Sequence, residues 1–519
     1  MIVSSLSVEV CVAFAIIFVA SRVHKVVSAL QLLNYTPGMR VPFSPVSLVG
    51  AIIPTVWWNP GLHWEWLWRK TAYMNREHEL ISVIPFLHGI PSYYACSVNV
   101  LKQVTNAERQ MEKPRDVMIP LLTWGENLIS ANDEVWKRHR RVVGPAFSPN
   151  LYALVVKETI STYREMVSSE GWMADAENLV PNFNEIPKKL ALIIISRCGF
   201  GLPASWADES NPDNPSYGKT LGIVSDTTIP RLIIPNWAYK LPIKSLQNID
   251  HTWRKLAIDM DEFVVRRNEE LSEASIGSQK HGDDIFTRLV SAMDEDSKIG
   301  LNKSEVIGNT FALMFAGHET TAHVLSATFG FLAVYQDQQN KGLAEVLEVI
   351  GKDRDPEVDD LSRMPHLLAC FHEALRIFPA GVVLFRDIVE DIPIHLTRPK
   401  EQVVCLRKGS RLLVDMVGVH HDPQTFPDPE TFKPSRWYGV PETAVSMFGL
   451  GPRACIGRKF ALTEAVCFLA IFLRDWKIDV ALNPGETREQ YKERVMMNAA
   501  KVGLSFGVGT IPVKVTKRA

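Results

Sequence analysis

Two stretches of this sequence contain residues whose types and spacing could do chemistry. The first is AGHETTAH, at positions 316–323, in which His318, Glu319 and His323 suggest a zinc hydrolase. Zinc hydrolases with a helical motif carry two histidines four residues apart, because that spacing puts both imidazoles on one face. The spacing of five found here leaves the two rings roughly 140° apart around a helix. Zinc binding is therefore not favoured.

Gly317 and Thr320 suggest another function for the same stretch, which is to bring the helix close to a flat group. A glycine inside a helix costs about 1 kcal/mol relative to alanine, but it lets the backbone approach a flat group or lets one turn open. Thr320 could turn its hydroxyl into such an opening. A glycine and a threonine in a buried helix are more often explained by packing and by hydrogen bonds to the helix backbone, so this stretch does not decide the function alone.

The second stretch is FGLGPRACIG, at positions 448–457. Its glycines permit a tight turn against a large planar ligand. A helical run follows Gly457, and the N–H groups at a helix N-terminus would stabilise the thiolate of Cys455. Arg453 adds a positive charge two residues before the sulfur. This pattern indicates a reactive or ligand-binding cysteine.

The element expected to hold the first stretch is a helix from Asn302 to about Tyr335. Asn302 can cap it, and Glu305 follows at the capping-box spacing. Such a helix is roughly 50 Å long, and because it is apolar on nearly all sides it should run through the protein interior.

Helical patterning extends from about Val98 to Arg376, strands are expected around 380–396 and 411–420, and helix returns after Gly457. The predicted class is mainly α with a small β part.

Together these motifs resemble the cytochrome P450 superfamily, over essentially the whole chain. The pattern FxxGxRxCxG around Cys455 matches the haem-binding signature at every position, and AGHETT resembles the oxygen-binding groove of the long central helix that lies over the haem. EALR (373–376), FKPSRW (432–437) and WKRHR (136–140) are similar to three further family motifs. The overall style is that of membrane-anchored eukaryotic, fungal-like haem-thiolate monooxygenases.

The resemblance implies a role for each matching residue. The cofactor would be heme b (iron protoporphyrin IX), with the Cys455 thiolate as the axial ligand of the iron. The residues expected to hold the haem are Cys455, Trp136, Arg140, Arg386, Arg453, Phe448 and Gly449. Those expected in oxygen binding and proton delivery are Gly317, Glu319 and Thr320. Glu373 and Arg376, one helical turn apart, would form a buried charge-paired cluster with Arg436 that holds the cysteine loop.

The implied reaction inserts one oxygen atom of O2 into a small molecule. The apolar residues expected near the pocket favour a lipophilic substrate, in terpenoid or polyketide secondary metabolism. The chain has no flavin or nucleotide fingerprint, so electrons would come from an NADPH–cytochrome P450 reductase, and the basic run 137–141 with Arg458 and Lys459 could face that partner. Two alternatives remain: a haem-thiolate isomerase or dehydratase that needs no O2, and a non-enzymatic haem binder.

Composition sets the broad limits. The chain has 519 residues, 46% of them hydrophobic, and a formal charge of -2. Without a basic excess, nucleic acid is not an implied partner. The seven cysteines are widely spaced and include no CxxC, which fits a reducing compartment rather than a disulfide framework.

The N-terminus predicts attachment to a membrane. Residues 10–20 are uncharged, and the basic residues at 22–25 favour a cytosolic catalytic domain. We expect a single-pass anchor at 1–21, a membrane-proximal linker at 22–70, a catalytic domain at 71–519, and an endoplasmic reticulum location. A buried core helix is the alternative for the anchor. The linker holds Trp57, Trp58, Trp64, Trp66 and Trp68, which suit either a membrane interface or a small aromatic core.

Overall fold

The computed structural model describes residues 2–173, 176–207, 217–274, 284–293, 300–497, 500–502 and 505–518. The chain divides into two compact units. The sheet unit comprises residues 1–117, 382–429 and 450–452, and the helical unit comprises residues 118–381, 430–449 and 453–519. The mainly helical class with a small sheet part, expected from the sequence, is confirmed.

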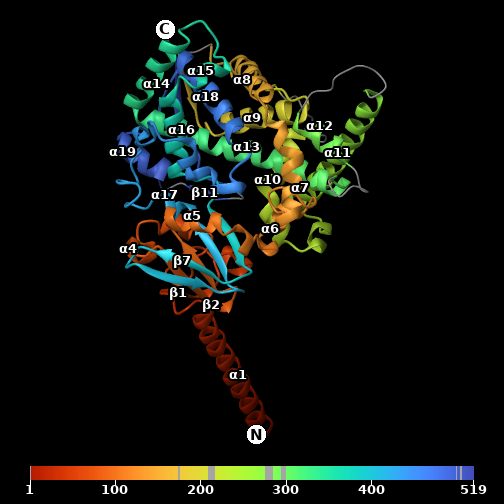
Figure 1. The fold of residues 1–519 in the computed structure, drawn as a ribbon, viewed down its shortest axis with the longest axis vertical. Coiled ribbons are helices and arrows are strands. Elements are labelled where there is room, and N and C mark those ends of the chain that lie inside the picture. Colours follow the sequence, from red (N-terminus) through yellow and green to blue (C-terminus); the bar gives the residue numbers. More distant parts are fainter. Residues whose placement is uncertain are drawn as a thin grey trace. The chain divides into compact units, whose positions relative to one another are not determined.

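The sheet unit is built on a six-stranded mixed sheet whose strand order is β1-β2-β3-β9-β6-β4 (Figure 1). Its central strands are fully buried, and β3 pairs in parallel with β9. The strands are β1 (Gly38–Phe43), β2 (Leu80–His88), β3 (Ser92–Ala95), β4 (Met111–Glu112), β6 (Val383–Ile388) and β9 (Arg411–Asp415), with a separate hairpin of β7 (Ile392–Leu396) and β8 (Gln402–Leu406). The helices are α1 (Ile2–Leu32), α2 (Leu48–Ile52), α3 (Trp64–Leu67), α4 (Ala72–Arg76), α5 (Val98–Asn106) and α17 (Met416–His420), and α6 (Arg115–Leu122) leads out of the unit.

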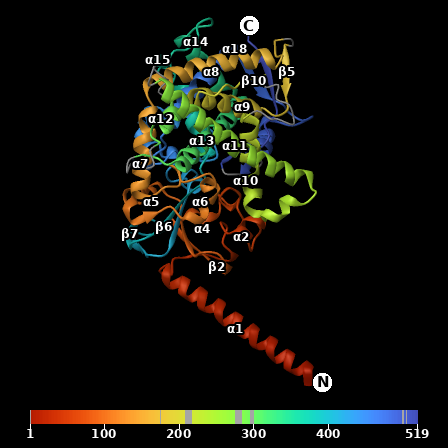
Figure 2. The ribbon, with the colours of Figure 1, turned by 90° about the vertical axis from the view of Figure 1, so that its right-hand side faces the viewer.

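Helix α1 is long and apolar enough to cross a membrane between Glu9 and Leu32. It extends away from the end of β2 in Figure 2. The helix continues past residue 21 to Leu32, because no helix breaker precedes Pro37, and the end of the anchor at residue 21 stays a prediction. Near its C-terminal end Ala29 joins the core of the sheet unit, and Arg22 donates a hydrogen bond of 3.0 Å to the carbonyl of Leu87.

The five tryptophans of the predicted linker divide between the two expected environments. Trp57 is 90% exposed and Trp58 is also exposed, whereas Trp64 is completely buried and Trp66 nearly so. Trp64 lies against Tyr94 at a ring-centroid distance of 5.2 Å, and it also contacts Trp68 at 6.3 Å. The later part of the segment is therefore an aromatic core, and only its start presents tryptophan to the surroundings.

The helical unit packs its long helices around α13 (Lys303–Val334). Helices α9 (Glu185–Ile194) and α16 (Pro365–Ile377) lie directly beside α13 (Figure 1). The other helices are α7 (Asp133–Val143), α8 (Pro149–Ser169), α10 (Tyr217–Ile233), α11 (Lys244–Ala274), α12 (Ile285–Ser291), α14 (Gln336–Val349), α15 (Val358–Leu361), α18 (Arg458–Asp475) and α19 (Arg488–Tyr491). Strands β10 (Trp476–Val480), β13 (Val513–Lys517) and β5 (Glu177–Val180) form a three-stranded sheet, and β11 (Ala500–Val502) pairs with β12 (Phe506–Val508).

The predicted central helix and its cap match the structure closely. Asn302 is the N-cap of α13, and it forms a complete capping box with Glu305. One strand prediction was wrong at its end: residues 416–420 form α17 rather than continuing β9. The side chain of Asp415 accepts the N–H of Gly418 at 2.8 Å and thereby starts a helix.

Two tryptophan substitutions test the division of the linker. Trp64→Ala should lower the free energy of unfolding by about 3–5 kcal/mol, because it empties a large buried site. Trp57→Ala removes a side chain that is 90% exposed and should change stability by less than about 0.5 kcal/mol. Denaturant unfolding monitored by circular dichroism measures both. Equal losses would contradict the aromatic-core assignment.

Candidate functional site

After its first turns, α13 has one short stretch that is only partly buried. From Gly308 to Val334, a stretch described throughout, every residue is buried except Ala316, Gly317, Glu319, Thr320 and His323. Four of these five are spaced by three or four residues, so they share one face of the helix. The open face coincides with the AGHETTAH stretch. An otherwise apolar interior helix thus presents an acid, a hydroxyl and an imidazole together.

Gly317 and Thr320 are explained locally by packing and backbone bonding. A side-chain carbon at Gly317 would come within 2.8 Å of Ile195, so only glycine allows the neighbouring segment to approach. The Thr320 hydroxyl donates to the carbonyl of Ala316 at 2.7 Å, which directs its oxygen along the helix. His318 is fully buried and contacts the Met314 carbonyl at 2.9 Å through Nδ1, and burial lowers its pKa to about 4. His318 and His323 therefore lie on different faces, in agreement with their five-residue spacing.

His323 was considered in the sequence only as a zinc ligand, and its position next to Glu319 was missed. Its Nε2 lies 4.0 Å from Oε1 of Glu319, one turn earlier on the same helix. The backbone of β12 confines the imidazole, because a side-chain carbon on Gly507 would come within 2.3 Å of its Nδ1. The spacing of four residues between an acid and a histidine was the available sequence signal.

The loop before Cys455 turns at a glycine and is tied back to its own start. Gly449 has a φ of 74°, a conformation that favours glycine. The N–H of Cys455 donates to the carbonyl of Phe448 at 2.8 Å. Helix α18 begins at Arg458, so the thiol lies just before a helix N-terminus. Phe448 itself contacts the ring of His372 on α16, with 6.3 Å between centroids.

Cys455 is exposed, although many protein groups surround its thiol. Burial is the largest influence on it and raises its pKa. The backbone N–H groups of Gly457 and Arg458 and the charges of Arg140 and Arg458 act in the opposite direction. These N–H groups and positive charges favour a negative charge on the sulfur.

Trp136, Arg140 and Arg453 gather near this thiol. Arg453 lies over the ring of Trp136, with its guanidinium carbon 4.4 Å from the centroid, and it donates to the carbonyl of Ala131 at 2.6 Å. Arg140 is half-buried, and burial lowers its pKa while the charge of Cys455 raises it. The structure thus brings two guanidinium groups and an indole to one region of the helical unit.

Arg386 belongs to the other unit. It lies on β6 and donates to the carbonyl of Phe385 at 2.8 Å. Its expected role as a haem ligand stays a prediction.

Glu373, Arg376 and Arg436 come together as a buried cluster. Glu373 and Arg376 are fully buried and share two hydrogen bonds of 2.9 Å, and Arg436 donates to Glu373 at 3.2 Å. The carboxylate also accepts the indole N–H of Trp437 at 2.9 Å and the backbone N–H of Lys433 at 3.0 Å. This set of donors compensates the cost of burying the charge.

The basic run 137–141 does not face outward as a whole. Lys137 and Arg141 are exposed, as expected for a partner surface. Arg138 instead forms an ion pair with Glu305 of α13, and His139 is completely buried. Arg138 and His139 are therefore not available to a partner as the basic run was expected to be, because both contact the carboxylate of Glu305 from the interior helix.

Comparisons with known proteins agree with these features. The family model for cytochrome P450 matches residues 52–506. The chain is 29% identical to cytochrome P450 monooxygenase 124 of Postia placenta, over 92% of this chain and 93% of that protein. It is also 27% identical to human cytochrome P450 4F12 over 79% of each chain, and 25% identical to the monooxygenase prx9 of Penicillium rubens over 80% of this chain and 78% of that one.

The chain belongs to the cytochrome P450 family, and it is an oxidoreductase of the monooxygenase type. The family implies a haem-thiolate cofactor. The residues present fit such a group: an accessible cysteine thiol sits among N–H donors and positive charge, and an indole with two guanidinium groups can bind carboxylates nearby.

Glu373→Gln tests the buried cluster. The substitution keeps the shape of the side chain but removes the charge that compensates Arg376, so it should cost about 3–5 kcal/mol of stability. Thermal unfolding of the variant measures this loss. Asp391→Asn removes an exposed carboxylate paired with Arg407 and is the control, with an expected loss below about 1 kcal/mol. A small loss at Glu373 would mean that the cluster is not a structural anchor.

Proposed function

We propose that this protein is a membrane-bound haem-thiolate monooxygenase that inserts one oxygen atom of O2 into a lipophilic small molecule, with electrons from an NADPH–cytochrome P450 reductase. The observation that carries the proposal is the Cys455 thiol, accessible within the protein and held at the start of α18 among groups that favour its charge. When bound, heme b with a thiolate ligand supplies the binding and activation of O2.

Two groups of residues would hold the cofactor. Cys455 would ligate the iron, supported by Phe448 and Gly449 in its loop. Trp136, Arg140 and Arg453, with Arg386 from the sheet unit, would bind the haem carboxylates. Charge-assisted hydrogen bonds from guanidinium groups to carboxylates are among the stronger polar contacts, which suits them to fixing the plane of a large ligand.

The open face of α13 would deliver protons. Thr320 would present its hydroxyl oxygen on that face while its hydrogen bonds to Ala316. Glu319 would supply protons to Thr320, and His323, 4.0 Å from Glu319, would extend the route by one turn. Gly317 would keep this part of the helix close to its neighbours. Protic groups on the open face favour an O2-using enzyme over the isomerase, dehydratase and haem-binder alternatives, which need no such route.

Exposed basic residues, the apolar interior and helix α1 each support one of the proposed partners: the reductase, the substrate and the membrane. Lys137, Arg141 and Lys459 are exposed basic residues of the helical unit and would attract an acidic reductase. The apolar surroundings of Ala316 on α13 favour a lipophilic substrate, and the substrate class that we propose is a terpenoid or polyketide of secondary metabolism. Helix α1 would anchor the chain in the endoplasmic reticulum membrane with the catalytic domain in the cytosol.

Cys455→Ala should abolish thiolate ligation. The wild-type protein, reduced and treated with carbon monoxide, should show a strongly red-shifted Soret band, and the variant should show none. Product formation should fall to background, because no other side chain replaces the ligand. An unchanged spectrum in the variant would overturn the assignment of Cys455. Cys467→Ala, at a buried cysteine on α18, is the matched control and should keep the band.

Thr320→Ala should separate electron use from product formation. NADPH consumption should continue, whereas product per NADPH should fall by about tenfold or more, as for the loss of a positioned proton donor, and hydrogen peroxide should rise. Thr328→Ala, a threonine on the same helix with the same bond to its own backbone at 2.7 Å, is the control. Equal coupling in the two variants would exclude Thr320 from the proton route.

A further inference from the structure

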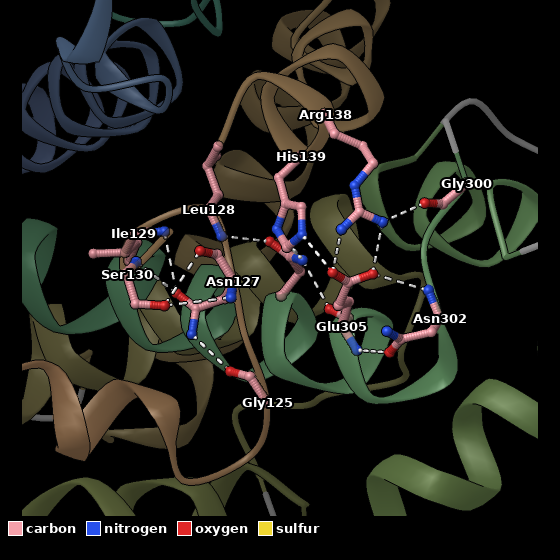
Figure 3. A network of polar contacts seen from close by, with 11 residues as sticks. Gly125, Asn127, Leu128, Ile129, Ser130, Arg138, His139, Gly300, Asn302 and Glu305 are labelled. Atoms are coloured by element: carbon pink, nitrogen blue, oxygen red, sulfur yellow. Dashed lines mark hydrogen bonds and ion pairs between the residues drawn. The ribbon is translucent and has the colours of Figure 1, made fainter. Parts of the chain in front are cut away.

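A buried polar network joins α7 to the first turns of α13 (Figure 3). Arg138 and His139 lie between Trp136 and Arg140 of the WKRHR motif, and the other residues of the network lie outside the family motifs quoted above. At its centre Glu305 accepts two hydrogen bonds from Arg138, one of them at 2.9 Å, and it receives the N–H of Asn302 at 3.0 Å. Nε2 of His139 lies 3.3 Å from the same carboxylate. One side chain thus completes the cap of α13 and fixes α7.

The contacts of Asn309 decide which nitrogen of the His139 ring carries the proton. Its carbonyl oxygen accepts the N–H of Leu128 at 2.9 Å, so its amide nitrogen must be a donor. That nitrogen donates to the carbonyl of Glu305 at 2.7 Å and to Nδ1 of His139 at 3.0 Å. His139 is therefore neutral, with its proton on Nε2 facing Glu305. Burial lowers the pKa of His139, which agrees with the neutral form.

The charge of Glu305 is well compensated. Its burial alone would raise its pKa, but the hydrogen bonds from Arg138, Asn302 and His139 outweigh that effect and lower the pKa. Glu305 is thus ionised at neutral pH. A charged acceptor inside the protein strengthens each of these bonds relative to a neutral one.

The loop before α7 packs against α13 with no room for side chains. A side-chain carbon on Gly308 would come within 2.6 Å of the carbonyl oxygen of Gly125, and one on Gly125 would come within 2.2 Å of the carbonyl oxygen of Ser304. Asn127 closes the following turn by accepting the N–H groups of Ile129 and Ser130, each at 3.1 Å. The turn ends at Ala131, whose carbonyl holds Arg453.

We propose that Glu305, His139 and Asn309 are positioning residues for the haem edge, because they orient the residues that would bind the haem carboxylates. Arg138 and His139 fix the helix that carries Trp136 and Arg140, and the Asn127 turn places the Ala131 carbonyl that orients Arg453. The inference rests on the proposed function, since it assigns to these residues the task of supporting a haem site.

Glu305→Gln is the most direct test. Glutamine suits the capping box equally well, but it cannot accept from Arg138 and His139 as a charged carboxylate does. Haem should transfer from the purified full-length protein to excess apomyoglobin about tenfold faster than from wild type, as is typical when a supporting outer contact of a metal site is lost. A larger share of the reduced, carbon-monoxide-treated protein should also lose the red-shifted band. Arg138→Lys, a milder change that leaves the cap intact, should give a smaller effect in the same direction.

The control is a glutamate-to-glutamine substitution at another Glu–Arg ion pair, which lies outside the Glu305 network. Glu165 of α8 accepts two hydrogen bonds from Arg197, at 2.8 and 3.0 Å. Glu165→Gln should lower stability but leave the rate of haem loss within twofold of wild type. If Glu305→Gln also stays within twofold, or if both variants accelerate haem loss equally, the positioning role is overturned.

A double variant separates positioning from general stability. Arg140→Leu alone should accelerate haem loss. The double variant with Glu305→Gln should lose haem more slowly than the product of the two single effects predicts, because Glu305 acts in part through Arg140. Independent, multiplicative effects would overturn the proposal. Wild type is measured first: a red-shifted band there supports the proposed function whatever the variants do, and its absence would overturn both the function and this inference.

Discussion

The structure of the helical unit depends on one constraint: α13 is apolar on almost every side and must be covered on almost every side. A 32-residue helix of this kind, roughly 50 Å long, is stable only if other helices surround it. Its neighbours α9 and α16 therefore have little freedom of placement. The same coverage makes the open stretch around Thr320 informative, because polar groups on an interior helix are costly unless they have a task or a partner. Burial of the helix thus sets where chemistry can take place.

Buried carboxylates are the second organising feature. The charges of two of them, Glu373 and Glu305, are compensated in the same way. Glu373 is surrounded by Arg376, Arg436 and backbone or indole donors, and Glu305 by Arg138, His139 and the N–H of Asn302. In both cases removal of a partner would leave a charge inside the protein, which costs far more than the pair contributes. Such clusters are therefore rigid. The first lies beside the ring contacts that reach Phe448 in the cysteine loop, and the second holds α7.

Much of this arrangement could be predicted from the sequence, and the exceptions share a physical cause. Local signals were sufficient for α13, because its cap and its all-round apolar surface lie within the helix itself. The pairing of Glu373 with Arg376 was expected from the resemblance of EALR to a family motif, and their spacing of three residues on one helix agrees with it. Local signals failed for Arg138, which looked like a surface residue, because its partner Glu305 lies 167 positions later. They failed likewise for residues 416–420, where the side chain of Asp415 starts a helix in a run of strand-forming residues.

The two supports differ in what they can control. The Glu373 cluster acts from α16 through the ring contacts of His372 with Trp437 and Phe448, so its loss would disturb the loop that carries Cys455, the proposed iron ligand. The Glu305 network acts from α13, the same helix that carries the open face, and it reaches Arg140 and Arg453 through α7 and the Ala131 carbonyl. Any shift of the start of α13 would therefore move the haem-edge residues together with the helix. Because the Glu305 carboxylate both caps α13 and binds α7, the proposed proton-delivering face and the proposed carboxylate-binding residues depend on the same side chain for their positions.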